Sequence, residues 1–132
     1  VKLRYLDEYS AARRKAADWY DKALGGLPGI GIPERSSFST HVFHQYTLKL
    51  DGIDREGLMN ELDSKGIPSM IYYPLPLHVQ QAFRYLGYPG NDFPVSRRLC
   101  GSVLSLPMHT ELDEEQLRHI TSSIVEFVTR KP

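Results

Sequence analysis

The spacing of apolar residues switches along this chain between every third or fourth position and every second position, and the switch limits its possible folds. Residues 3–24 follow the first spacing, which predicts one long amphipathic helix that ends at the glycine pair 25–26. Residues 27–33 are rich in glycine and proline and predict an irregular linker. Residues 40–50 alternate strictly and predict a half-buried strand. A chain with both periods must pack helices against a sheet.

Two more apolar runs, residues 67–73 and 103–106, predict the other strands of this sheet. Pro74 and Pro107 follow them directly, and proline ends a strand because it lacks the amide proton that a sheet ladder needs. The sequence therefore predicts a sheet of three or four strands.

Helices are predicted between these strands and after the last one. Asp54 can cap one helix, and Asp113 begins the final helix, where Gln116 completes a capping box. Shorter helices are predicted at residues 78–86 and 92–100. The predicted fold class is α/β, with helices mainly on one face of the sheet and a long N-terminal helix.

The composition is that of one globular domain without a strong electric field. The chain has 132 residues, of which 41% are hydrophobic and 24% are charged. Sixteen basic residues balance 16 acidic ones, so we expect neither nucleic acid nor an anionic membrane as a partner. The single cysteine, Cys100, excludes an internal disulfide and fits a cytoplasmic setting.

Sequence patterns for metal binding and nucleophilic catalysis are lacking. His41 and His44 resemble a ligand pair, but an odd separation on a strand places them on opposite faces. Cys100 has no histidine or carboxylate near it in sequence, so we expect a packing thiol rather than a nucleophile. We therefore predict no catalytic residue, no cofactor-binding residue and no metal ligand in this chain.

The most unusual segment joins two tyrosines, two prolines and a histidine. Tyr72 and Tyr73 end a predicted strand, Pro74 and Pro76 stiffen its exit, and His78 opens the next helix. Prolines reduce the freedom of the loop, so the two hydroxyls and the imidazole are held ready for a ligand. The alternative is that the tyrosines only pack at a sheet edge, and the residues by themselves leave both interpretations open.

Six segments together resemble the C-terminal domain of the DegT/StrS family of sugar aminotransferases, in the family's order and spacing. They lie at residues 9–14, 41–47, 66–80, 86–88, 92–94 and 104–108, and the match in which they lie extends over nearly the whole chain. One departure is Arg97, which follows Ser96 where family members commonly have a small residue followed by glutamate.

The resemblance implies an enzyme that depends on pyridoxal phosphate (PLP) and moves an amino group, usually from glutamate, to a nucleotide-linked keto-sugar. Such enzymes are dimers of the aspartate-aminotransferase fold (fold type I). Residues 1–132 are then the C-terminal small domain, with the large PLP-binding domain absent from this chain. The chain begins inside a helical pattern without a capping residue, which also favours a piece of a longer polypeptide.

By the same resemblance, Tyr72 and Tyr73 form part of the wall over the sugar and reach the sugar-nucleotide near the dimer interface. His78 supports or contacts this wall. No lysine of the chain lies in the family's lysine motif, so no PLP is expected on this fragment. Without the large domain, apolar surface should be exposed on the first helix and around Tyr72. Two alternatives stay open: a domain of a sugar dehydratase of the same family, dependent on pyridoxamine phosphate (PMP), and a non-catalytic binding module.

Overall fold

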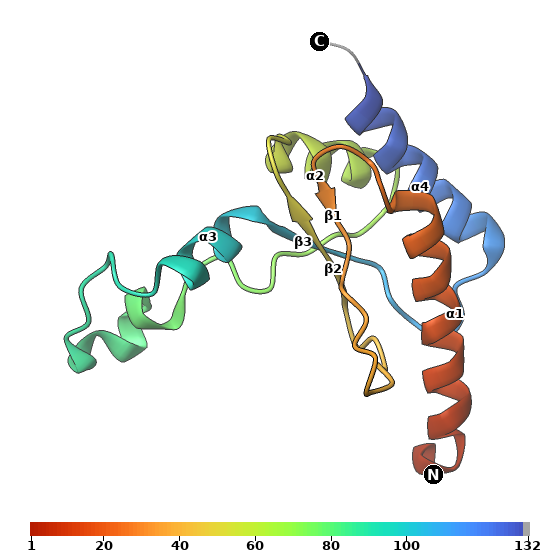
Figure 1. The fold of residues 1–132 in the computed structure, drawn as a ribbon, viewed down its shortest axis with the longest axis horizontal. Helices are drawn as coiled ribbons and strands as arrows, with labels where there is room; N and C mark the ends of the chain where they lie inside the picture. Colours follow the sequence, from red (N-terminus) through yellow and green to blue (C-terminus); the bar gives the residue numbers. More distant parts are fainter. Residues whose placement is uncertain (131–132) are drawn as a thin grey trace.

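The structure, a computed structural model, describes residues 1–130. The chain contains both helices and short strands, as Figure 1 shows. In order, the elements are the 3-10 helix η1 (Lys2–Tyr5), α1 (Leu6–Leu24), β1 (Ile30–Gly31), β2 (Tyr46–Leu50), α2 (Arg55–Ser64), the 3-10 helices η2 (Leu77–Val79) and η3 (Gln81–Leu86), α3 (Pro94–Ser102), β3 (Val103–Leu106) and α4 (Glu114–Thr129).

The sheet is antiparallel, with β2 between β1 and β3. On the free side of β3, Met70 and Ser105 exchange both backbone hydrogen bonds, at 3.1 and 2.8 Å. The three predicted segments therefore pair with one another, and the prediction of three or four strands is confirmed. Two details were wrong: residues 67–73 contribute one bridge rather than a strand, and the predicted linker contains β1.

Three helices, α1, α2 and α4, cover one face of the sheet and close the core with it. Tyr46, Leu48 and Leu50 of β2 point into this core, in the alternation that the sequence predicts. The helices contribute a shared set of buried residues: Ala16, Ala17, Tyr20, Leu24, Leu58, Leu62, Leu117, Ile120 and Ile124. Helices mainly on one face are thus confirmed.

The predicted strand at residues 40–50 is too long, because β2 begins only at Tyr46. Its partner β3 ends at Leu106, opposite Tyr46, and Pro107 follows, so the residues before Tyr46 have no ladder to join. Phe43 has a positive φ of 47° and is buried, although in a regular strand it would lie on the face opposite to Tyr46 and Leu48. The His41 Nδ1 atom accepts a hydrogen bond from the Phe43 amide at 2.8 Å.

The segment between α2 and β3 forms an arm, defined here as residues 74–102, that projects away from α1 and α4 (Figure 1). The helix predicted at residues 78–86 is in fact the two 3-10 helices η2 and η3, because Gln80 between them is extended. None of η2, η3 and α3 contains a buried residue. Arg55 fixes the base of the arm, since its Nη1 atom donates to the Cys100 carbonyl at 2.7 Å.

Two buried tyrosines join α1 to the sheet. The rings of Tyr20 and Tyr46 lie 4.8 Å apart, and the Tyr46 hydroxyl donates to Asp21 Oδ1 at 2.7 Å. Asp21 also binds Arg35, whose guanidinium lies 4.6 Å above the Phe43 ring. Burial, and then the hydrogen bond to Asp21, raises the pKa of Tyr46 far above its usual value.

This connection predicts a stability effect at alkaline pH. In the unfolded chain a tyrosine loses its proton near pH ~10, whereas Tyr46 holds it to higher pH when folded. The stability that this proton supplies is present below pH ~10 and is lost as pH rises further. Tyr46→Phe should lower the free energy of unfolding by about 1 kcal/mol at pH 7 and flatten its fall above pH ~10. Urea unfolding at several pH values measures both effects.

The matched control is Tyr85→Phe, because Tyr85 is 81% exposed and removing its hydroxyl should change neither quantity. Equal unfolding curves for wild type and Tyr46→Phe at every pH would contradict the role given to this hydroxyl.

Candidate functional site

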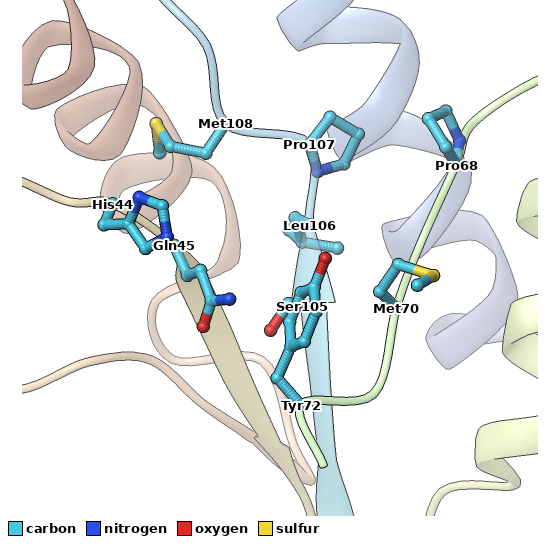
Figure 2. A pocket seen from close by; sticks show the side chains of 9 residues that line it. All are labelled: His44, Gln45, Pro68, Met70, Tyr72, Ser105, Leu106, Pro107 and Met108. Atoms are coloured by element: carbon cyan, nitrogen blue, oxygen red, sulfur yellow. The ribbon is translucent and has the colours of Figure 1, made fainter. Parts of the chain in front are cut away.

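A hollow of about 190 Å³ lies at the end of β3, and we refer to it as the Tyr72 hollow. Figure 2 shows the Tyr72 ring against β3, with His44 and Gln45 on one side and Met70 on the other. Nine residues line it: His44, Gln45, Pro68, Met70, Tyr72, Ser105, Leu106, Pro107 and Met108. They come from three stretches of chain that are far apart in sequence.

Ser105 places this hollow relative to the layers of the fold. Leu104 and Leu106 point into the core, so the side chain of Ser105 between them points to the other face of β3. There it shares a hydrogen bond of 2.8 Å with Thr47 of the neighbouring strand. The Tyr72 hollow therefore opens on the sheet face that α1, α2 and α4 do not cover.

The backbone bridge between Met70 and Ser105 holds Tyr72 in place two residues later. Tyr72 is 40% exposed and lines the hollow, while Tyr73 is 68% exposed and lies outside the lining. A cis peptide bond joins the two tyrosines, and their rings meet edge to face at 5.8 Å. Tyr72 therefore lines the hollow, and Tyr73 does not.

Helix α1 fixes the opposite wall of the hollow. The hydroxyl of Tyr20, a fully buried residue, donates to the Pro107 carbonyl at 2.8 Å. Burial raises the pKa of Tyr20, so this hydroxyl stays protonated and keeps donating at pH values where an exposed tyrosine would ionise. Pro107 and Met108 are therefore positioned by a side chain of the core.

His78, the third predicted site residue, lies in a different place. It lines a separate hollow of about 380 Å³ within the arm, together with Phe83, Leu86, Tyr88 and Phe93. Its ring lies 4.9 Å from that of Phe93, and its Nε2 atom is buried without a hydrogen-bond partner among the described residues. The structure therefore brings Tyr72, but not Tyr73 or His78, into the hollow at the end of β3.

Several residues of the Tyr72 hollow were not predicted from the sequence. His44 and Gln45 had been assigned to a regular strand, and Met70, Ser105 and Met108 had been given no role in the site. Ser105 did carry a signal, since it is the one polar residue in the apolar run 103–106. The other residues reach the hollow only because the fold brings distant segments together, so the sequence gives no local sign of them.

The described lysines do not fit a PLP site. A lysine that binds PLP covalently needs a lowered pKa, which requires a desolvated pocket. Lys65 is the least exposed of them, yet its hydrogen bond to Glu126 at 3.0 Å raises its pKa, and Glu61 lies 3.2 Å from the same nitrogen. Lys2, Lys15, Lys22 and Lys49 are exposed.

Metal binding and membrane insertion find no structural support in the described part of the chain. Residues 1–130 contain no group of three histidine, cysteine or acidic side chains arranged to hold a metal ion. His41 and His44 were predicted to lie on opposite faces of one strand and so to be unable to share a metal ion. That reasoning was wrong, because β2 begins only at Tyr46. No helix within residues 1–130 has the length and hydropathy to cross a bilayer.

Comparison with known proteins identifies the family. Residues 1–125 match the DegT/DnrJ/EryC1/StrS aminotransferase family. The erythromycin biosynthesis sensory transduction protein EryC1 of Saccharopolyspora erythraea is 36% identical over 124 residues, which are 94% of this chain and 33% of that protein. The UDP-N-acetyl-3-dehydro-alpha-D-glucosamine 3-aminotransferase of Acidithiobacillus ferrooxidans is 41% identical over 120 residues, 91% of this chain and 31% of that protein.

The fold agrees with this family. The crystal structure of S. venezuelae DesV in complex with a ketimine intermediate matches with a TM-score of 0.92 at 30% identity, covering 98% of this chain and 34% of that one. The chain belongs to the DegT/DnrJ/EryC1/StrS aminotransferase family, and the predicted aspartate-aminotransferase-type small-domain fold is confirmed. It spans about a third of the length of these relatives.

The environment of the lysines predicts the outcome of a labelling experiment. When the 132-residue chain is mixed with PLP and reduced with borohydride, mass spectrometry should find weak labelling spread over the exposed lysines. The physical reason is that four of the five described lysines are exposed, and the fifth, Lys65, has a pKa raised by its hydrogen bond to Glu126. Lys65→Arg is the control and should leave the labelling pattern of the other lysines unchanged. One lysine labelled stoichiometrically in the wild type would overturn this assignment.

Proposed function

We propose that this chain is the small domain of an intact PLP-dependent aminotransferase that transfers an amino group, from glutamate, to a nucleotide-linked keto-sugar. Its own contribution is the Tyr72 hollow, which forms part of the wall over the sugar. The observation that carries the proposal is the position of Tyr72, which lines a hollow on the uncovered sheet face in a chain of this family.

The lining of the Tyr72 hollow suits a sugar ring. Pro68, Met70 and Met108 offer apolar contacts to the carbon faces of the ring. Tyr72, Ser105 and Gln45 offer hydroxyl and amide groups that can donate to and accept from sugar hydroxyls. A keto-sugar presents both kinds of surface, so this mixture favours it over a purely apolar ligand.

In this proposal PLP carries the amino group between donor and sugar, and the rest of the protein holds it. The described lysines do not provide its attachment point, so this chain binds and orients the sugar and excludes water from it. We further propose that the intact protein is a cytoplasmic homodimer. The relative from A. ferrooxidans, whose name gives it a UDP-linked amino-sugar reaction, supports the choice of a nucleotide-sugar substrate.

Two tyrosine variants of the intact protein test the wall. Removing a hydroxyl that bonds a buried ligand group costs about 1–3 kcal/mol, or roughly 5- to 150-fold in kcat/KM. Tyr72→Phe should therefore lower kcat/KM for the nucleotide-sugar by about that factor. Tyr73→Phe, which changes a residue outside the hollow, is the matched control and should stay within about twofold of wild type. His78→Ala should have a smaller effect than Tyr72→Phe.

Thermal unfolding of each variant separates packing from ligand contact. If Tyr72 only packs, Tyr72→Phe lowers the melting temperature while the folded enzyme keeps a normal kcat/KM, and the wall assignment is wrong. Product analysis distinguishes the reactions: an aminated sugar supports the aminotransferase, a deoxygenated sugar supports a PMP-dependent dehydratase, and no turnover with retained sugar binding supports a binding module.

A further inference from the structure

A second hollow, of about 360 Å³, lies between the N-terminus of α2 and the arm, and two arginines line it. We propose that Arg55 and Arg97 form a subsite for a phosphate group carried by an organic ligand. With the proposed function, on which this identification rests, that group is the phosphate of the nucleotide-linked sugar.

Arg55 is held rigidly at this place. Its Nη1 atom donates to the carbonyl oxygens of Cys100, at 2.7 Å, and Val103, at 3.4 Å, so the guanidinium plane is fixed at the junction of α3 and β3. These carbonyls are neutral acceptors and leave its positive charge without a counter-ion. A fixed guanidinium loses little further entropy when it binds an anion.

Arg97 approaches the same hollow from α3, one turn before Cys100. Within residues 1–130, all side-chain ion pairs within 4.0 Å involve other basic residues, namely Arg35, Lys65, His109 and Arg130. Two guanidinium groups of like charge thus line one cavity without a carboxylate in its lining. An anion in the cavity would relieve their repulsion and accept charge-assisted hydrogen bonds.

The distribution of charge along the chain supports an anionic ligand. Residues 66–110, which include the arm and most of the lining of the Tyr72 hollow, contain three arginines and a single carboxylate, Asp92. The other 15 acidic residues of the 16 in the chain lie outside this stretch. This region is therefore poor in carboxylates although the whole chain is neutral. A phosphate that enters it meets little repulsion from negative side chains.

The remaining wall of the hollow is apolar. Pro74, Leu75, Pro76 and Val79 line it beside the two arginines. Free inorganic phosphate would leave this wall uncovered, whereas a phosphate ester with an apolar or aromatic part would cover it. The mixed lining therefore favours a nucleotide over a free ion.

The position of this hollow along the chain connects it to the proposed sugar site. Tyr72 lines the first hollow and Pro74 lines the second, two residues later. Two residues span at most about 7 Å between Cα atoms, so the two linings lie no further apart than this along the backbone. A ligand with a sugar joined to a phosphate matches that order.

Calorimetric titration of the 132-residue chain with uridine diphosphate, inorganic pyrophosphate and uridine tests the subsite at low salt. Arg97→Gln is the variant, because Arg97 is exposed and its replacement leaves the core intact. It should weaken uridine diphosphate binding about tenfold. Arg98→Gln removes the same charge from the next, also exposed, residue of α3 outside the hollow, and should weaken binding less than twofold.

If both variants weaken uridine diphosphate binding equally, the effect comes from the overall charge of the chain, and the proposed subsite is wrong. Uridine binding as tightly as uridine diphosphate would also overturn it. If pyrophosphate binds as tightly as uridine diphosphate and only Arg97→Gln weakens it, the subsite takes free phosphate and the nucleotide assignment is wrong. These titrations need neither cofactor nor turnover, so a failure of aminotransfer in the intact protein would leave their result standing.

Discussion

Tyr20 and Tyr46 join α1 to the sheet, with their rings 4.8 Å apart. Both rings are wholly buried, and aromatic side chains of this kind supply much of the apolar area that stabilises a small core. The Tyr46 hydroxyl donates to Asp21 Oδ1 of α1, and the Tyr20 hydroxyl donates to the Pro107 carbonyl directly after β3. Both acceptors are thereby satisfied. One contact thus aligns the long helix and also sets the direction in which the chain leaves β3.

The position of the Tyr72 hollow follows from that alignment. The core side of β3 is occupied by α1, α2 and α4, so residues on its other side, Ser105 above all, are left to line a hollow. The arm departs from the same edge and is joined to the body through Arg55. Because its helices bury no residues, large apolar side chains such as Leu77 and Tyr85 are exposed on it. Exposure on the first helix and around Tyr72 had been predicted and is confirmed.

The features predicted correctly from the sequence are those set by local interactions. The caps at Asp54 and Asp113 both form as predicted, since each depends on atoms within three residues of the cap. Strand limits depend instead on a partner elsewhere in the chain. Residues 40–45 alternate like a strand but stay outside the sheet because β3 ends opposite Tyr46. Because these residues were predicted to be part of a regular strand, the position of His44 and Gln45 in the lining of the Tyr72 hollow was not predicted.

We propose that this chain supplies the wall over a nucleotide-linked sugar and that the rest of the protein holds the cofactor. A crystal structure of the intact protein with a bound nucleotide-sugar tests this proposal most directly. We expect the sugar ring to contact the Tyr72 hollow, with the Tyr72 hydroxyl within about 3 Å of a sugar oxygen. We also expect the lysine joined to PLP to lie outside residues 1–132. A sugar bound elsewhere, with other protein side chains filling the Tyr72 hollow, would contradict the proposal.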